Sequence, residues 1–130
     1  MGKVLITGVA GLLGSRLADW ILENTDNEVV GVDDLSGGYI ENVNSKVKFY
    51  KFNLTDLNEL DGVFKNEKPD IVYHFAAYAA EGLSPFIRKY NYENNLIAST
   101  NLITKSIQYD IDRFVFASSM SVYGDKYEPP

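Results

Sequence analysis

Cysteine is absent from this chain of 130 residues, histidine occurs once, and 12 basic residues stand against 18 acidic ones. The lack of cysteine excludes disulfides, thiol catalysis and cysteine-ligated metal sites. A single histidine argues against a histidine-rich metal centre, and we expect no bound metal. The formal net charge of −6 lacks the basic footprint of a nucleic-acid binder. No apolar run approaches the roughly 20 residues that span a bilayer.

Apolar residues make up 45% of the chain and charged residues 23%, which is typical of a globular domain. The first ten residues predict a strand and a turn, not a charged stretch followed by an apolar signal core. We therefore expect one domain, without nucleic-acid or membrane partners, in the cytoplasm.

Short apolar runs alternate with amphipathic segments along the chain. The runs predict five strands, at residues 3–7, 28–33, 47–52, 70–75 and 113–117. The segments between them predict a helix from Leu13, a second helix capped by Thr55, and a long helix over residues 86–109. In the long helix we expect four apolar side chains to face inward: Leu96, Leu102, Ile103 and Ile107. This alternation is typical of right-handed βαβ units and a parallel sheet.

The sharpest motif is TGVAGLLG at residues 7–14, between the first strand and the first helix. Gly8 suits a tight turn, Gly11 lets backbone amides approach a pyrophosphate, and Gly14 lets the helix pack closely on the sheet. The helix start offers unpaired N–H groups and the positive end of its dipole. A glycine-rich turn without a ligand is the alternative, but the position between strand and helix favours dinucleotide binding.

Asp33 ends the second predicted strand, about 20 residues after the glycine turn. A carboxylate there hydrogen-bonds a ribose 2′-hydroxyl and repels a 2′-phosphate, which favours NAD over NADP. Arg16 is the one feature that points toward a 2′-phosphate, and we expect it to be solvated on the first helix instead. Asp34 either shares the ribose or adenine contact or caps a turn.

The glycine spacing resembles the TGxxGxxG motif of the extended short-chain dehydrogenase/reductase family. Further stretches resemble the family in order and spacing: VDDLSGG at 32–38, FNLTD at 52–56, HFAA at 74–77, YENN at 92–95 and FASSMSVYG at 116–124. Among its subfamilies the chain is most similar to the NAD-dependent nucleotide-sugar epimerases and dehydratases, the UDP-glucose 4-epimerases in particular. The resemblance implies an α/β Rossmann-type fold, three-layer αβα, with a parallel sheet of about five strands in the order 3-2-1-4-5.

The resemblance also implies a role for each matching residue toward NAD. Pyrophosphate would be held by Gly8, Gly11, Leu12, Leu13 and Gly14. Ribose and adenine would be met by Asp33, Asp34, Asn53 and Leu54. The nicotinamide side would be lined by Phe75, Ala76, Ala77 and Ser118. Asn95 would support the site from the long helix, and Ser119 would be catalytic, hydrogen-bonding the reacting sugar oxygen.

In that family a keto–alcohol interconversion runs by hydride transfer through nicotinamide, with a tyrosine of a Y-x-x-x-K pair as the base. None of the nine tyrosines here has a lysine four residues later. The family's pair lies beyond the segment matched by residues 116–124. We therefore expect residues 1–130 to be the NAD-binding part of a larger enzyme, lacking its substrate domain and inactive alone. The alternatives are a stand-alone NAD-responsive binding module and a non-functional remnant.

Three further expectations concern side chains outside the glycine turn. Asn53 stands where the family usually has aspartate, and its amide oxygen can still accept from the adenine amine. His74 is expected in the core rather than as an acid or base. Six aromatic side chains are expected to pack in the core and at a helix interface: Tyr73, Phe75, Tyr78, Phe86, Tyr90 and Tyr92. We also expect a homodimer, through the long helix or an exposed sheet edge.

Overall fold

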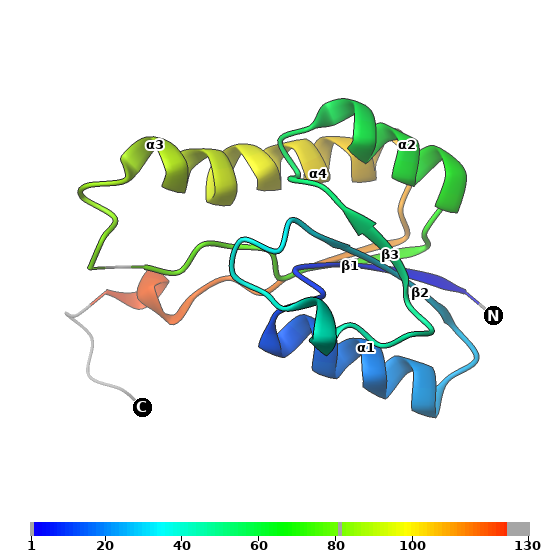
Figure 1. The fold of residues 1–130 in the computed structure, drawn as a ribbon. Coiled ribbons are helices and arrows are strands. Elements are labelled where there is room, and N and C mark those ends of the chain that lie inside the picture. The colour runs from blue at the N-terminus through cyan, green and yellow to red at the C-terminus, as the bar shows by residue number, and fades with distance from the viewer. Residues whose placement is uncertain (1, 81, 125–130) are drawn as a thin grey trace.

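The computed structural model describes residues 2–80 and 82–124, which form three layers (Figure 1). The middle layer is a parallel sheet of five strands in the order β3-β2-β1-β4-β5. The strands are β1 (Lys3–Thr7), β2 (Glu28–Asp33), β3 (Lys48–Lys51), β4 (Ile71–His74) and β5 (Arg113–Phe116). This confirms the predicted Rossmann-type sheet and its strand order.

Helices cover both faces of the sheet, with α1 on one side and α2 and α4 on the other (Figure 1). The α-helices are α1 (Leu12–Asn24), α2 (Leu57–Glu67), α3 (Arg88–Asn91) and α4 (Ala98–Gln108). A π-helical segment, Tyr92–Ile97, joins α3 to α4, and 3₁₀ turns lie at Ile40–Asn42 and Met120–Tyr123. None of the helices in the described ranges is both long and apolar enough for a bilayer crossing.

Two apolar cores lie on opposite faces of β1, because successive residues of a strand point to opposite sides. Leu5 belongs to the core formed with Phe64 of α2 and Leu102 of α4. Ile6 belongs to the core formed with Ile21 of α1. A parallel sheet needs cover on both faces, which explains why β1 is apolar without alternation. The carboxyl end of this rigid strand runs directly into the glycine turn.

The cap predicted for the second helix is one residue off. The Asp56 side chain is the true cap of α2, accepting from the N–H groups of Asn58 and Glu59 at 3.0 and 3.1 Å. The Thr55 hydroxyl instead donates to Oδ1 of Asn53 at 2.8 Å. Both residue types cap helices well, and the competing bond to Asn53 decides between them.

The long helix buries a different stripe from the predicted one. Leu102 is fully buried as expected, but Leu96, Ile103 and Ile107 are 52%, 43% and 75% exposed. The buried positions of α4 are Ala98, Ser99, Leu102 and Ser106. This stripe consists mostly of small residues, so a search for large apolar side chains assigned the wrong face.

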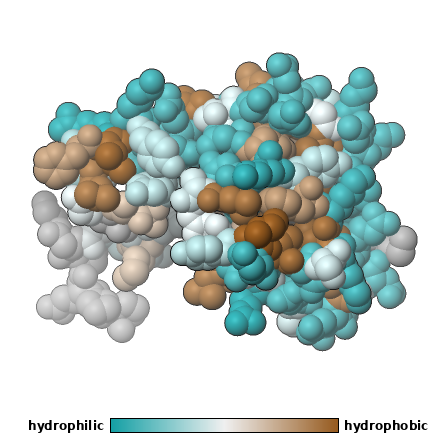
Figure 2. All heavy atoms as spheres, in the orientation of Figure 1, coloured by the Kyte–Doolittle hydropathy of each residue, from teal (hydrophilic) through white to brown (hydrophobic). Residues whose placement is uncertain are grey.

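Three of the six aromatic side chains expected to be packed are exposed: Phe86 by 85%, Tyr92 by 61% and Tyr90 by 38%. Tyr90 still packs edge to face on Tyr78, with ring centroids 4.9 Å apart. Figure 2 shows apolar side chains at the surface over the segment that leads into α3, where Leu83 is 53% exposed.

A buried carboxylate joins the amino ends of β1 and β3. Glu67, at the end of α2, pairs with Lys3 of β1 and Lys48 of β3 at 3.2 and 2.6 Å. The Tyr50 hydroxyl donates to the same carboxylate. Burial alone would raise the pKa of Glu67, but hydrogen bonds from Lys48, Tyr50 and Lys3 outweigh it and lower the pKa to about 2.

Candidate functional site

A pocket of about 320 Å³ opens at the carboxyl ends of β1, β2 and β4. In an open α/β sheet this crevice is the place where ligands bind. Its lining contains nine residues that the sequence singled out: Gly8, Gly11, Asp33, Asp34, Asn53, Leu54, Phe75, Ala76 and Ala77. The sequence analysis gave no role in the site to the other nine lining residues: Val32, Ser36, Gly37, Gly38, Phe52, Tyr78, Ala79, Asn94 and Ala98.

The three glycines of the turn have different reasons to be glycine. Gly8 has φ +71°, and a Cβ there would lie 2.7 Å from the backbone nitrogen of Ala76. A Cβ on Gly14 would collide with the carbonyl of Gly8. Gly11 has an ordinary φ of −83°, and a Cβ on it would meet only the Gly8 oxygen, at 3.3 Å. Protein packing therefore explains Gly8 and Gly14, whereas Gly11 leaves space on the pocket side.

The start of α1 is suited to an anion. Gly11 is its N-cap, no side chain caps the helix, and its first turn carries no acidic residue. The helix dipole and the free amides of the first turn are therefore not neutralised by a side chain. Leu12 and Leu13, predicted at the pyrophosphate, are 73% and 63% exposed and do not line the pocket. Gly14 also lies outside its lining.

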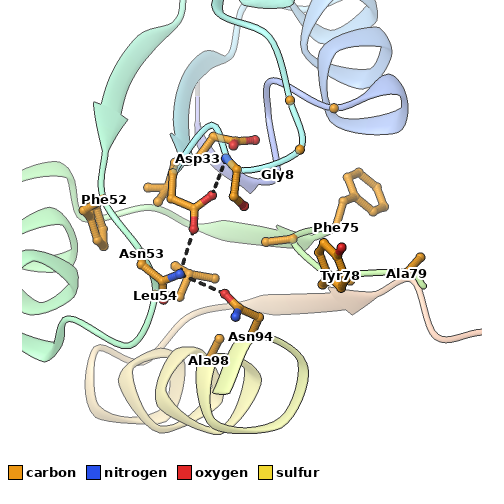
Figure 3. A pocket seen from close by; sticks show the side chains of 18 residues that line it. Gly8, Asp33, Phe52, Asn53, Leu54, Phe75, Tyr78, Ala79, Asn94 and Ala98 are labelled. Carbon is orange, nitrogen blue, oxygen red and sulfur yellow. Dashed lines mark hydrogen bonds between the residues drawn. The ribbon is translucent and has the colours of Figure 1, made fainter. Parts of the chain in front are cut away.

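Asp33 ties the end of β2 to the glycine turn. Its Oδ2 accepts from the Ala10 N–H at 3.0 Å, and its Oδ1 accepts from the Leu35 N–H at 2.8 Å. Figure 3 shows Asp33 beside Gly8. A carboxylate has about four acceptor positions, so two remain to accept from a diol. A ribose bound next to a pyrophosphate at this turn would therefore meet two open acceptor positions of the Asp33 carboxylate.

Asp34, Asn53 and Asn94 form a hydrogen-bonded chain on the other wall of the pocket. Nδ2 of Asn53 donates to Oδ2 of Asp34 at 2.7 Å and to Oδ1 of Asn94 at 2.9 Å (Figure 3). The Asp34 carboxylate also accepts from the Ser36 N–H at 2.8 Å. Burial would raise the pKa of Asp34, but the hydrogen bonds from Ser36 and Asn53 outweigh it and hold the pKa below its usual range. The carboxylate is therefore ionised at neutral pH.

The π-helical segment supplies two consecutive asparagines to the site. Asn94 meets Asn53, while Asn95 holds the backbone of Tyr78, accepting from its N–H at 2.6 Å and donating to its carbonyl at 2.9 Å. Asn95 does not itself line the pocket. Asn95 instead contacts the loop after β4, which lines the pocket, so its side chain supports that loop. π-Helical turns are rare and concentrate at functional sites.

His74 lies in the core, as expected, with 2% of its surface exposed. Its Nε2 lies 2.8 Å from the Ser99 hydroxyl, which donates to the Asn95 carbonyl at 2.6 Å. The Ser99 oxygen must therefore accept from Nε2–H, which leaves Nδ1 to accept from Thr7. Burial lowers the pKa of His74 to about 4, so the ring is neutral.

Ser118 and Ser119 follow β5 and do not line the pocket. Ser118 adopts a left-handed φ of +59°, which is uncommon for a residue other than glycine. Ser119 is exposed, and its hydroxyl caps the 3₁₀ turn by accepting from the Ser121 N–H at 3.1 Å. The predicted catalytic hydroxyl thus lies in a turn with its own local hydrogen bond.

The glycine turn between β1 and α1, the carboxylate after β2 and the pocket at the strand ends define a dinucleotide-binding α/β domain. Comparison with known proteins narrows this class. The model of the NAD dependent epimerase/dehydratase family matches residues 4–130. The chain belongs to this family.

Individual relatives agree with that family. A UDP-glucose 4-epimerase of Schizosaccharomyces pombe is 38% identical over 98% of this chain and 38% of its own length. The solved UDP-glucose 4-epimerase of Thermotoga maritima with UDP-glucose superposes with a TM-score of 0.93 at 34% identity, covering 98% of this chain and 41% of that one. The Thermus thermophilus enzyme, solved as a complex with NAD, gives 0.83 at 32% identity, covering 90% and 37%. The chain thus spans about two fifths of the length of these relatives.

Proposed function

We propose that residues 1–130 bind NAD and form the cofactor-binding part of a nucleotide-sugar epimerase or dehydratase. The observation that carries the proposal is Gly11. Its φ does not demand glycine, and a Cβ there would meet one atom within 4 Å, the Gly8 oxygen, in a tight contact of 3.3 Å. Gly11 also lines the pocket at the start of a helix that no side chain caps. A pyrophosphate approaching the α1 amides supplies the missing reason.

The residues of this chain would bind and orient the cofactor. The α1 amides would receive the pyrophosphate, and the carboxylate of Asp33 would accept from the ribose hydroxyls and repel a 2′-phosphate. Phe75, Ala76 and Ala77 line the pocket beyond β4 and would face the nicotinamide. When bound, NAD would supply hydride transfer, the chemistry that interconverts an alcohol and a ketone.

Catalysis would need groups that these 130 residues do not supply. Ser119 would hydrogen-bond the reacting sugar oxygen, but no tyrosine is followed by lysine four residues later. The loss of general acid–base catalysis costs about 10²–10⁴-fold in rate. We therefore expect no measurable conversion of UDP-glucose by this chain with NAD. The missing pair also keeps open the second proposal, a binding module that responds to NAD without chemistry, and measurable turnover would contradict both.

Calorimetric titration with NAD, using NADP as the control, tests the cofactor proposal. We expect NAD to bind at least about 10-fold more tightly than NADP, because a 2′-phosphate would bring its charge against Asp33. Equal affinities would show that Asp33 does not meet the ribose. No binding of either dinucleotide would contradict the proposed function of this chain.

We further propose that the chain self-associates through its β5 edge or its long helix. β5 pairs only with β4 among the described strands, so its outer edge has unpaired backbone groups. Exposed apolar side chains flank it, with Phe116 and Met120 57% and 86% exposed, and Ile107 of α4 is 75% exposed. Sedimentation is expected to show dimers or larger species. A monodisperse monomer at high concentration would contradict this proposal.

A further inference from the structure

The carbonyl group of Ala10, inside the glycine turn, is held by the loop that follows β2. Its oxygen accepts from the Tyr39 N–H at 3.2 Å and from Nδ2 of Asn42 at 3.0 Å. A carbonyl oxygen has two acceptor positions, so both are occupied. Ala10 is fully buried, and its own N–H donates to Asp33. Both peptide groups of Ala10 are therefore held by residues at the end of β2 and in the loop after it.

This carbonyl is also the acceptor that a longer α1 would use. In an α-helix each N–H donates to the carbonyl four residues earlier, so Ala10 is the acceptor for Gly14. The first bonded amide of α1 is instead that of Ser15, which donates to the Gly11 carbonyl at 3.0 Å. Among the residues that the structure describes, the N–H groups of 12–14 have no acceptor. One more helical bond, from Gly14 to Ala10, would remove one of these three amides.

The loop can approach Ala10 this closely because residue 38 is glycine. A Cβ on Gly38 would lie 2.7 Å from the carbonyl carbon of Ala10 and 2.8 Å from its Cβ. Gly38 has no positive φ, so the contact with Ala10 explains the glycine, not the backbone conformation. Figure 1 shows the loop after β2 running beside α1.

A second asparagine of the same loop bonds to α1 at a different place. Nδ2 of Asn44 donates to Oδ1 of Asp19 at 2.8 Å, and its Oδ1 accepts from the Lys46 N–H at 3.0 Å. Asp19 lies about two turns along α1 from the start of the helix. Asn44 therefore attaches the loop to the helix, whereas Asn42 bonds the glycine turn. The two side chains form a matched pair for mutation.

We propose that Asn42 sets the position at which α1 begins: together with Tyr39 it occupies the Ala10 carbonyl, and this keeps the Gly14 N–H available to the pyrophosphate. The inference rests on the proposed NAD binding. Asn42 does not line the pocket, so it is a positioning residue that acts through Ala10. It is exposed, so burial in the core does not explain an amide at this position.

Hydrogen exchange of the Gly14 amide, followed by NMR without cofactor, tests the effect on the helix. Asn42→Ala opens one acceptor position on the Ala10 oxygen, so α1 can gain a bond at its start. The Gly14 amide is therefore expected to exchange at least about threefold more slowly. Asn44→Ala is expected to leave this exchange unchanged or to accelerate it. A merely structural role of Asn42 would also accelerate it, so unchanged or faster exchange at Gly14 in Asn42→Ala would overturn the inference.

Titration with two ligands tests the effect on the pyrophosphate site. Asn42→Ala is expected to weaken NAD binding at least about 10-fold, the ratio typical of one hydrogen bond to a charged group, and Asn44→Ala to leave it unchanged. Adenosine has no phosphate, so its affinity, measured by NMR, is expected to be the same in the unaltered chain and in Asn42→Ala. An equal loss for both ligands would place the effect on the pocket as a whole and overturn the inference.

The outcomes separate this inference from the proposed function. If the unaltered chain does not bind NAD, the proposed function is wrong and the inference falls with it. If NAD binds the unaltered chain and Asn42→Ala equally well, the proposed function stands and the inference is overturned.

Discussion

The Thr7 hydroxyl lies 2.6 Å from Nδ1 of His74, across the neighbouring strands β1 and β4. The same hydroxyl oxygen accepts from the Ala76 N–H at 3.3 Å, and the far side of the ring reaches Ser99 of α4. One neutral ring therefore joins the strand before the glycine turn, the loop that lines the pocket and the long helix. Protonation would reverse the bond between Thr7 and His74, because a ring that donates from Nδ1 needs the Thr7 oxygen as its acceptor.

The free energy of unfolding should therefore decrease as the pH is lowered from 6.5. Burial lowers the pKa of His74 to about 4, so between 6.5 and 4 the unfolded chain binds a proton that the folded chain does not. The contribution is fully present above pH 6.5 and is lost by about 1.4 kcal/mol per pH unit below it, about 3 kcal/mol in full. Urea unfolding at pH 7, 6 and 5 measures this slope.

His74→Gln is the matched control for that slope. Gln can replace the Nε2–H donor but has no proton to gain. The variant should therefore be less stable at pH 7, and its free energy of unfolding should not change with pH between 6.5 and 5. The chain has no other histidine, and the pKa of Glu67 lies lower still, so this window belongs to His74. Equal slopes in the two proteins would show that the ring is not buried in its neutral form.

Glu67 predicts a second loss of stability at lower pH. Its folded pKa of about 2 lies below the ordinary 4.5, so its contribution is present above pH 4.5 and disappears as the pH falls toward 2. Glu67→Gln removes the charge that Lys3 and Lys48 share. We expect this variant to lose about 2 kcal/mol at pH 7 and to show a flatter profile below pH 4.5. An equally steep fall of the urea midpoint below pH 4.5 in Glu67→Gln and in the unaltered chain would contradict this role.

Substitutions at Gly11 and Gly14 should have different effects, the first on NAD binding and the second on the stability of the fold. Serine is a preferred N-cap, and the backbone at Gly11 already has an extended N-cap conformation, so Gly11→Ser should keep or raise stability. Its side chain would lie on the pocket side, so NAD affinity should fall at least about 10-fold. Gly14→Ala should instead destabilise by about 3 kcal/mol, because its Cβ would collide with the Gly8 carbonyl. Thermal unfolding and calorimetry on both variants check this, and unchanged NAD affinity in Gly11→Ser would contradict the role of Gly11.

The sequence predicted the features that depend on local chemistry. The glycine turn has to leave a strand and enter a helix, and the apolar run at β1 has to be covered on both faces, so the position of the pocket followed. The strand order came from the resemblance to the family. The three inward-facing residues of the long helix were predicted wrongly because its buried stripe uses small side chains such as Ala98 and Ser106. The π-helical segment has no sequence signal in a single chain, so the pairing of Asn94 with Asn53 could not be predicted.

The saturated amide of Asn53 shows why side-chain roles were harder to predict than positions. Position 53 was expected at the adenine, and it does line the pocket. Its oxygen was expected to be free, but the Thr55 backbone and hydroxyl occupy it. The same Thr55 hydroxyl is thereby unavailable to cap α2, so one local competition accounts for two differences from the sequence analysis.

Asn95 predicts how the π-helical segment supports the pocket. Its side chain makes two hydrogen bonds to the backbone of Tyr78, which lines the pocket after β4. Asn95→Ala removes both, so we expect the Tyr78 amide to exchange its hydrogen about 10-fold faster or more, and NAD binding to weaken. Thr100→Ala in the adjoining helix α4 is the control, because the Thr100 hydroxyl donates only to the Leu96 carbonyl among the bonds described. If both variants changed exchange at Tyr78 equally, the effect would come from a general loosening of the helix. A specific effect of Asn95→Ala would show that the π-helical turn holds the loop in its binding conformation.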